Sequence, residues 1–136
     1  MSFLLAVLIV AVAPDAPIEH RFPDAETVFA CDFEADVDED FNEFPDFWER
    51  RRGPGYPHYV KIAIESLPAP SGERALRIDL DGGAAVVSSP PIEINPLLSY
   101  VFQGSQSTAG LEHDEAYYGV RFTNVDGQTT GTLEGP

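Results

Sequence analysis

The stretch from Phe44 to Val60, FPDFWERRRGPGYPHYV, concentrates side chains that could bind a ligand in a chain that is otherwise acidic. It contains a tryptophan, two tyrosines and the three consecutive arginines Arg50, Arg51 and Arg52. Aromatic rings stack on the apolar faces of sugars, while guanidinium groups bind phosphate and carboxylate. Three interpretations follow: a phosphate grip, a stacking platform for a ligand, or a charge clamp that neutralises neighbouring acids.

The net charge of the chain argues against the phosphate grip. The 136 residues include 23 Asp and Glu but only 8 Lys and Arg, so the formal net charge is −15 at pH 7. An acidic surface repels nucleic-acid backbones and anionic lipid headgroups. We therefore expect no nucleic-acid partner and no membrane insertion of the mature domain. A glycan or another neutral ligand remains, as do cations.

A sugar site combines aromatic rings with a few polar groups that converge on the hydroxyls. The predicted ligand-binding residues supply both kinds of side chain: Trp48, Tyr56, Tyr59, Arg77, Asp79, Tyr117 and Arg121. The competing interpretation makes Trp48 a core residue and leaves the polar residues on a solvated sheet face. The sequence favours the core position for Trp48 and leaves the polar face open.

The sequence predicts no catalytic residues. It contains no Ser-His-Asp order, no nucleophile elbow and no Gly-rich phosphate loop. Glu34, Asp36 and Glu39 have the spacing of the catalytic carboxylates in one class of glycoside hydrolase. The intervening residues differ from that class, however, and the chain is short for such an enzyme. We therefore expect a binding protein and not an enzyme.

Two acidic runs could be mistaken for metal sites. The alternating aspartates of DVDED, residues 36–40, are followed by Phe41 where a calcium-binding EF-hand loop requires glycine, so an EF-hand is excluded. Residues 112–115 contain one histidine among acids, and no second histidine has a ligand spacing. Both runs are expected to be solvated loops.

The N-terminus carries an apolar run from Phe3 to Ala13. This length fits the core of a signal peptide and is too short to span a bilayer. Residues 1–16 are therefore predicted to be a signal-peptide-like leader, and the protein is expected to be secreted, periplasmic or in the cell envelope. The alternative is a buried N-terminal strand or helix. The lone cysteine, Cys31, excludes an internal disulfide.

Apolar and polar residues alternate with a period of two, which is typical of half-buried antiparallel strands. The alternation lies in residues 27–34, 58–66, 74–80 and 115–124. The predicted core contains Phe33, Ile62, Ile64, Leu76, Ile78, Tyr118, Val120 and Phe122. We expect an all-β fold, an antiparallel β-sandwich or jelly roll, in one domain over residues 25–136.

Turn residues divide these strands. Asp-Gly pairs at 81–82 and 126–127 predict two hairpins, and the prolines of residues 88–96 predict an edge strand or a crossover between sheets. Residues 128–136 stop soon after their apolar alternation begins. We therefore expect the sandwich to lack its last strand and the chain to be part of a longer polypeptide.

The order of these segments carries a family resemblance. It is seen in Asp32-Phe33-Glu34, in Gly72 to Leu76, in Pro90-Pro91, in Tyr100 to Phe102 and in Val120 to Gly127. This order resembles the jelly-roll carbohydrate-binding modules of the galactose-binding-like superfamily. The resemblance implies a non-catalytic glycan-binding module with no cofactor except a structural calcium ion, for which Glu34 is the matching metal ligand. The alternative is a spacer or protein-interaction sandwich of an envelope protein, with no sugar site.

Overall fold

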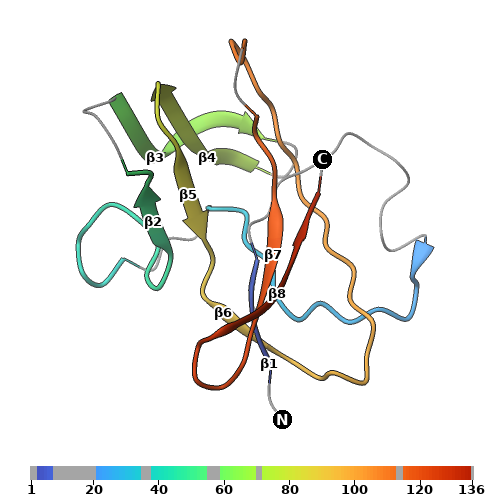
Figure 1. The fold of residues 1–136 in the computed structure, drawn as a ribbon. Helices are drawn as coiled ribbons and strands as arrows, with labels where there is room; N and C mark the ends of the chain where they lie inside the picture. The colour runs from blue at the N-terminus through green and yellow to red at the C-terminus, as the bar shows by residue number, and fades with distance from the viewer. Residues whose placement is uncertain are drawn as a thin grey trace. The chain divides into compact units, whose positions relative to one another are not determined.

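The computed structural model describes residues 21–34, 38–54, 59–69, 72–112 and 115–135, and the backbone alone of residues 3–7. These residues form eight strands (Figure 1): β1 (Phe3–Val7), β2 (Glu49–Arg52), β3 (Tyr59–Ala69), β4 (Gly72–Asp81), β5 (Ala85–Ser88), β6 (Pro91–Ile94), β7 (Gly119–Thr123) and β8 (Thr129–Glu134). Among the described residues, no helix is long and apolar enough to cross a membrane.

Every pairing between these strands is antiparallel. One sheet has four strands in the order β6-β1-β7-β8, and two ribbons pair β2 with β5 and β3 with β4. The predicted all-β fold class with antiparallel strands is confirmed, and these sheets are consistent with the predicted sandwich. The prolines of residues 88–96 do lie at an edge strand, because β6 ends the four-stranded sheet.

By its internal contacts the chain divides into two compact units. The terminal unit comprises Met1–Phe29 and Pro91–Pro136, and the middle unit comprises Ala30–Pro90. The single domain expected over residues 25–136 stays a prediction. Each unit is described by itself below.

The terminal unit is built on the four-stranded sheet. Its buried core consists of Ile92, Ile94 and Val120, against which the partly buried Phe29, Tyr100, Phe102 and Phe122 pack. The hairpin predicted at Asp126-Gly127 is confirmed, since it joins β7 to β8. Gly127 has a φ of 77°, a left-handed conformation that glycine adopts without steric cost.

The N-terminal apolar segment pairs with the sheet of the terminal unit. The backbone of β1 lies between β6 and β7 and pairs with both strands (Figure 1). Of the two sequence interpretations, the N-terminal strand corresponds to this backbone pairing. Removal of residues 1–16 as a leader stays a prediction.

The middle unit contains the two ribbons. Residues 59–66 and 74–80 form the longest pair, β3 with β4, as their alternation predicts. The hairpin predicted at Asp81-Gly82 is wrong: the turn there leads from β4 to β5, which pairs with β2 and not with β4. Phe44 and Val87 are the largest side chains that are almost fully buried among the described residues.

Two further strand and core predictions need correction. Residues 27–34 alternate in sequence, yet none of them lies in a strand. Ile78 was expected in the core but is 39% exposed. The remaining predicted core residues are buried or half-buried. Both errors have the same physical reason. Alternation shows which face of a segment can be buried, but it does not show whether another element is available to cover that face.

Candidate functional site

One face of the β3–β4 ribbon gathers several of the predicted ligand-binding side chains. The register places Tyr59 opposite Asp81 and Lys61 opposite Asp79, with Arg77 opposite Ala63. Successive side chains of a strand point to opposite faces, so these residues share one face while the isoleucines and leucines lie on the other. The polar face of the ribbon therefore follows directly from the alternation of polar and apolar residues in the sequence.

Ion pairs order the side chains on this face. Arg77 donates from Nε to Asp79 Oδ1 at 2.8 Å and from Nη1 to Glu65 Oε2 at 3.3 Å. Lys61 donates from Nζ to the other oxygen of Glu65. The hydrogen bond from Lys61 lowers the pKa of the Glu65 carboxyl, and the same bond raises the pKa of Lys61. The network links Arg77 and Asp79 on the face that also carries the ring of Tyr59, which is 60% exposed.

Trp48 is not part of this face. It is half-buried, and its ring lies 5.2 Å from that of Phe33, centroid to centroid, with the planes tilted by 54°. This is the core-like position that the sequence favours for Trp48. Tyr56, the second ring of the opening stretch, lies outside the described residues.

Tyr117 and Arg121 belong to the terminal unit. Tyr117 is 52% exposed, just before β7, and Arg121 is half-buried on β7. The Nε atom of Arg121 is buried and has no hydrogen-bond partner among the described residues. Of the predicted ligand-binding residues, Tyr59, Arg77 and Asp79 thus share one face of the middle unit. Tyr117 and Arg121 belong to the terminal unit.

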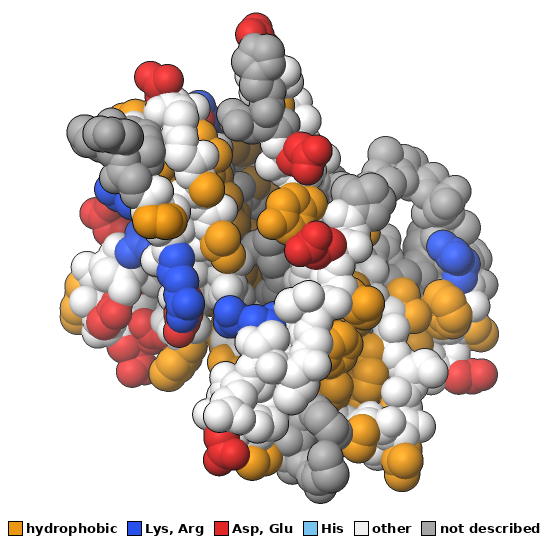
Figure 2. Space-filling view, in the orientation of Figure 1, with side chains coloured by type: hydrophobic (Ala, Val, Ile, Leu, Met, Phe, Trp, Pro, Cys, Tyr) orange, Lys and Arg blue, Asp and Glu red, His pale blue; other side chains and the backbone are white. Residues whose placement is uncertain are grey.

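The three consecutive arginines form most of β2, and two of them, Arg50 and Arg51, have local partners. Arg51 bonds to Glu49 at 2.6 Å, and the guanidinium of Arg50 lies 4.5 Å from the centroid of the buried Phe44 ring. On the face shown in Figure 2, blue Lys and Arg side chains lie among red and orange ones and form no continuous basic area in the described part. Arg50 and Arg51 therefore pack and pair within the middle unit, as a charge clamp would.

Glu34, the predicted calcium ligand, joins two parts of the middle unit. Its Oε1 accepts hydrogen bonds from the backbone N–H groups of Glu73 and Arg74, both at 2.7 Å. A Cβ on Gly72 would lie 2.7 Å from the Glu34 Cδ, so the carboxylate needs a glycine there. Because a carboxylate has two oxygens, its Oε2 remains the atom for the calcium interaction, which stays a prediction.

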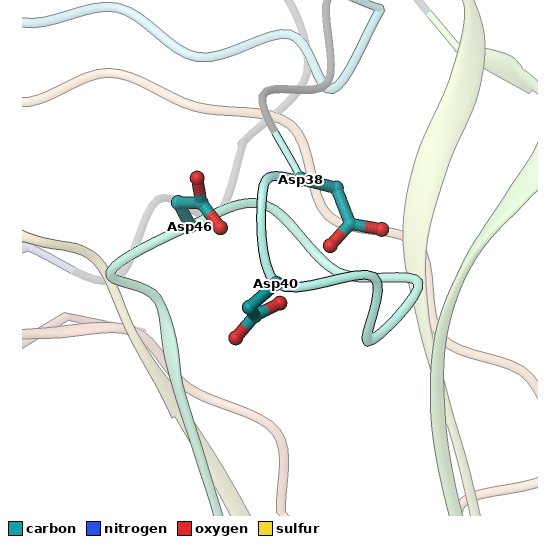
Figure 3. A group of neighbouring side chains, drawn as sticks. All are labelled: Asp38, Asp40 and Asp46. Carbon is teal, nitrogen blue, oxygen red and sulfur yellow. The ribbon is translucent and has the colours of Figure 1, made fainter.

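A second acidic group, missed by the sequence reasoning, lies in the loop before β2. Asp38, Asp40 and Asp46 each offer a carboxylate oxygen, and these atoms lie within 4.8 Å of one another (Figure 3). Asp46 accepts from the Glu39 N–H at 3.1 Å, and Asp38 accepts from the Asn42 N–H at 3.0 Å. Oxygen ligands at this spacing suit a hard cation. The spacing rule of a continuous calcium loop could not find the group, because Asp46 reaches it through the fold of the loop.

No protein-family model, no curated protein and no solved structure matches the chain.

Proposed function

We propose that this chain is a non-catalytic glycan-binding module of an exported protein. One observation carries the proposal: the exposed ring of Tyr59 shares one face of the β3–β4 ribbon with the hydrogen-bonded Arg77–Asp79 pair. A ring supplies the surface on which the C–H face of a sugar stacks. Charged groups on the same face supply donors and acceptors for hydroxyls, and their mutual hydrogen bonds before binding reduce the entropy cost.

The remaining predicted residues are assigned to the same function. Trp48, Tyr56, Tyr117 and Arg121 are proposed as further ligand-binding residues. A structural calcium ion is proposed as well, with Glu34 as one ligand. Hard oxygen ligands are available at Glu34 and at the Asp38, Asp40 and Asp46 group.

The test is a glycan array of neutral oligosaccharides, followed by titration calorimetry on any that bind. Tyr59→Ala should weaken binding by about 1 to 3 kcal/mol, as expected for the loss of one stacked ring. Phe47→Ala is the matched control, because Phe47 is also an exposed ring, at 82%, but lies in the loop before β2. Equal affinities for wild type and Tyr59→Ala would remove this face as the site.

The second candidate is a spacer or protein-interaction domain of an envelope protein. It is favoured by apolar side chains exposed in the terminal unit, with Leu97 89%, Leu98 62% and Val101 50% exposed. Neighbouring exposed apolar residues of this kind are common at protein interfaces. Absence of any glycan response, with concentration-dependent association in sedimentation that Leu97→Ser abolishes, would favour this function.

A further inference from the structure

The sheet of the terminal unit has a position between β6 and β7 that requires a particular strand. β1 occupies it, antiparallel to both neighbours (Figure 1). The register pairs alternate positions of β1 with core residues or with residues packed on the core: Ile94 is opposite Phe3, Ile92 and Phe122 are opposite Leu5, and Val120 is opposite Val7. Residues in register share a face of the sheet, so a strand here needs apolar residues at three alternate positions.

The other face of this position has a different requirement. Ala6 is the residue opposite Arg121 in the register. The buried Nε of Arg121 has no hydrogen-bond partner, and none of the ion pairs between described residues involves Arg121. A buried donor without an acceptor is costly. A strand with a carboxylate at the position of Ala6 would therefore fit the sheet better than β1 does.

Residues 29–33, FACDF, meet both requirements in the same order as residues 3–7, FLLAV. Phe29, Cys31 and Phe33 match the three alternate apolar positions, and Asp32 falls at the position of Ala6. Phe29 already packs against the core of this unit.

The observed conformation of this segment stores strain that a strand would relieve. None of residues 29–33 lies in a strand, and Phe33 has a φ of 61°. A bulky residue with positive φ is unusual and costs conformational energy. The Asp32 carboxylate accepts a hydrogen bond from the Glu34 N–H two residues away, a local contact that an extended backbone would replace.

We propose that residues 3–7 and residues 29–33 compete for the position between β6 and β7. Loss of the leader lets residues 29–33 take it, with Asp32 pairing to Arg121. The N-terminal segment thus acts as a temporary strand that holds the sheet together until the chain has been processed. The competition rests on the register alone; its trigger, removal of the leader, rests on the export that the proposed function includes.

The experiment weakens β1 in the full chain and follows amide hydrogen exchange. Leu5→Asn places an amide at the register position shared by the core residue Ile92 and Phe122. Leu4→Asn is the matched control, because Leu4 is opposite the polar Glu93 and Thr123. In Leu5→Asn we expect the amides of β6 and β7 to remain protected and those of residues 30–33 to gain at least about tenfold protection, and in Leu4→Asn neither to change.

A second substitution tests the Asp32–Arg121 pair. Adding Asp32→Ala to Leu5→Asn should lower the protection of residues 30–33 by about tenfold, the loss expected for one hydrogen bond to a charged group. If the protection of residues 30–33 does not rise in Leu5→Asn, the proposal is overturned, whether or not β6 and β7 exchange. Strong protection of residues 30–33 in the wild-type chain overturns it too. Failure of glycan binding leaves these results unchanged, so the two proposals are tested separately.

Discussion

The surroundings of Gly72 leave no space for a side chain at this position. The Glu34 carboxylate occupies the space of a side chain at position 72 and accepts two backbone hydrogen bonds from the start of β4. Gly72→Ala should displace the carboxylate and lower the free energy of unfolding by about 1 to 3 kcal/mol, measured by denaturant titration. In a Glu34→Ala background the same substitution should cost much less, since the clash is gone.

Gly131→Ala is the control for this prediction. An added Cβ at Gly131 would lie 3.8 Å from Phe122 Cδ2, an ordinary contact, so only a small change in stability is expected. Equal losses in Gly72→Ala with and without Glu34 would contradict the steric explanation.

The sequence could predict the half-buried position of Trp48 and the polar face of Arg77, because both follow from residue type and alternation. It could not predict the Glu34–Gly72 contact, which joins residues far apart in the chain.

At the scale of elements, the β3–β4 ribbon is held by a charge network that responds to pH. The hydrogen bond from Lys61, together with the charges of Lys61 and Arg77, lowers the pKa of Glu65 from its ordinary value of 4.5. A carboxyl whose pKa is lower in the folded state stabilises the fold above its unfolded pKa, and this contribution is lost as pH falls through the folded value. The free-energy difference between wild type and Glu65→Gln should therefore be constant above about pH 5.5 and shrink below pH 4.5.

The measurement is urea denaturation of both proteins between about pH 3 and pH 7, with Glu73→Gln as the control. Glu73 is an exposed carboxyl of β4 that makes no ion pair with a described residue. A free-energy difference between wild type and Glu65→Gln that does not change with pH would contradict the network.

Alternation predicted β3, β4 and β7 because each is apolar on one face. It could not predict β2, whose sequence ERRR has no alternation and whose partner β5 lies more than thirty residues away.

At the scale of the whole molecule, the sequence predicted the all-β class but not the assembly of the site. Alternation assigns residues to strand faces, and Tyr59, Arg77 and Asp79 share a face as expected. Tyr117 and Arg121 were predicted for the same ligand, yet they belong to the other unit. Which faces come together depends on contacts between sheets, and a period of two carries no information about those contacts.

The net charge of −15 gives the molecule two distinct responses to added ions. Repulsion among the acids destabilises the compact state. Salt screens this repulsion, so the melting temperature should rise between about 0.02 M and about 0.5 M NaCl.

A calcium site adds a separate effect, since an ion that binds only the folded state stabilises it by mass action. At constant ionic strength, about 1 mM CaCl₂ should raise the melting temperature further, whereas MgCl₂ should not, because Mg²⁺ requires a stricter octahedral geometry. Asp46→Asn and Glu34→Gln, melted with each ion, assign the calcium effect to the loop group or to Glu34. Equal shifts for the two ions in wild type would leave charge screening as the whole explanation and remove calcium from the proposed function.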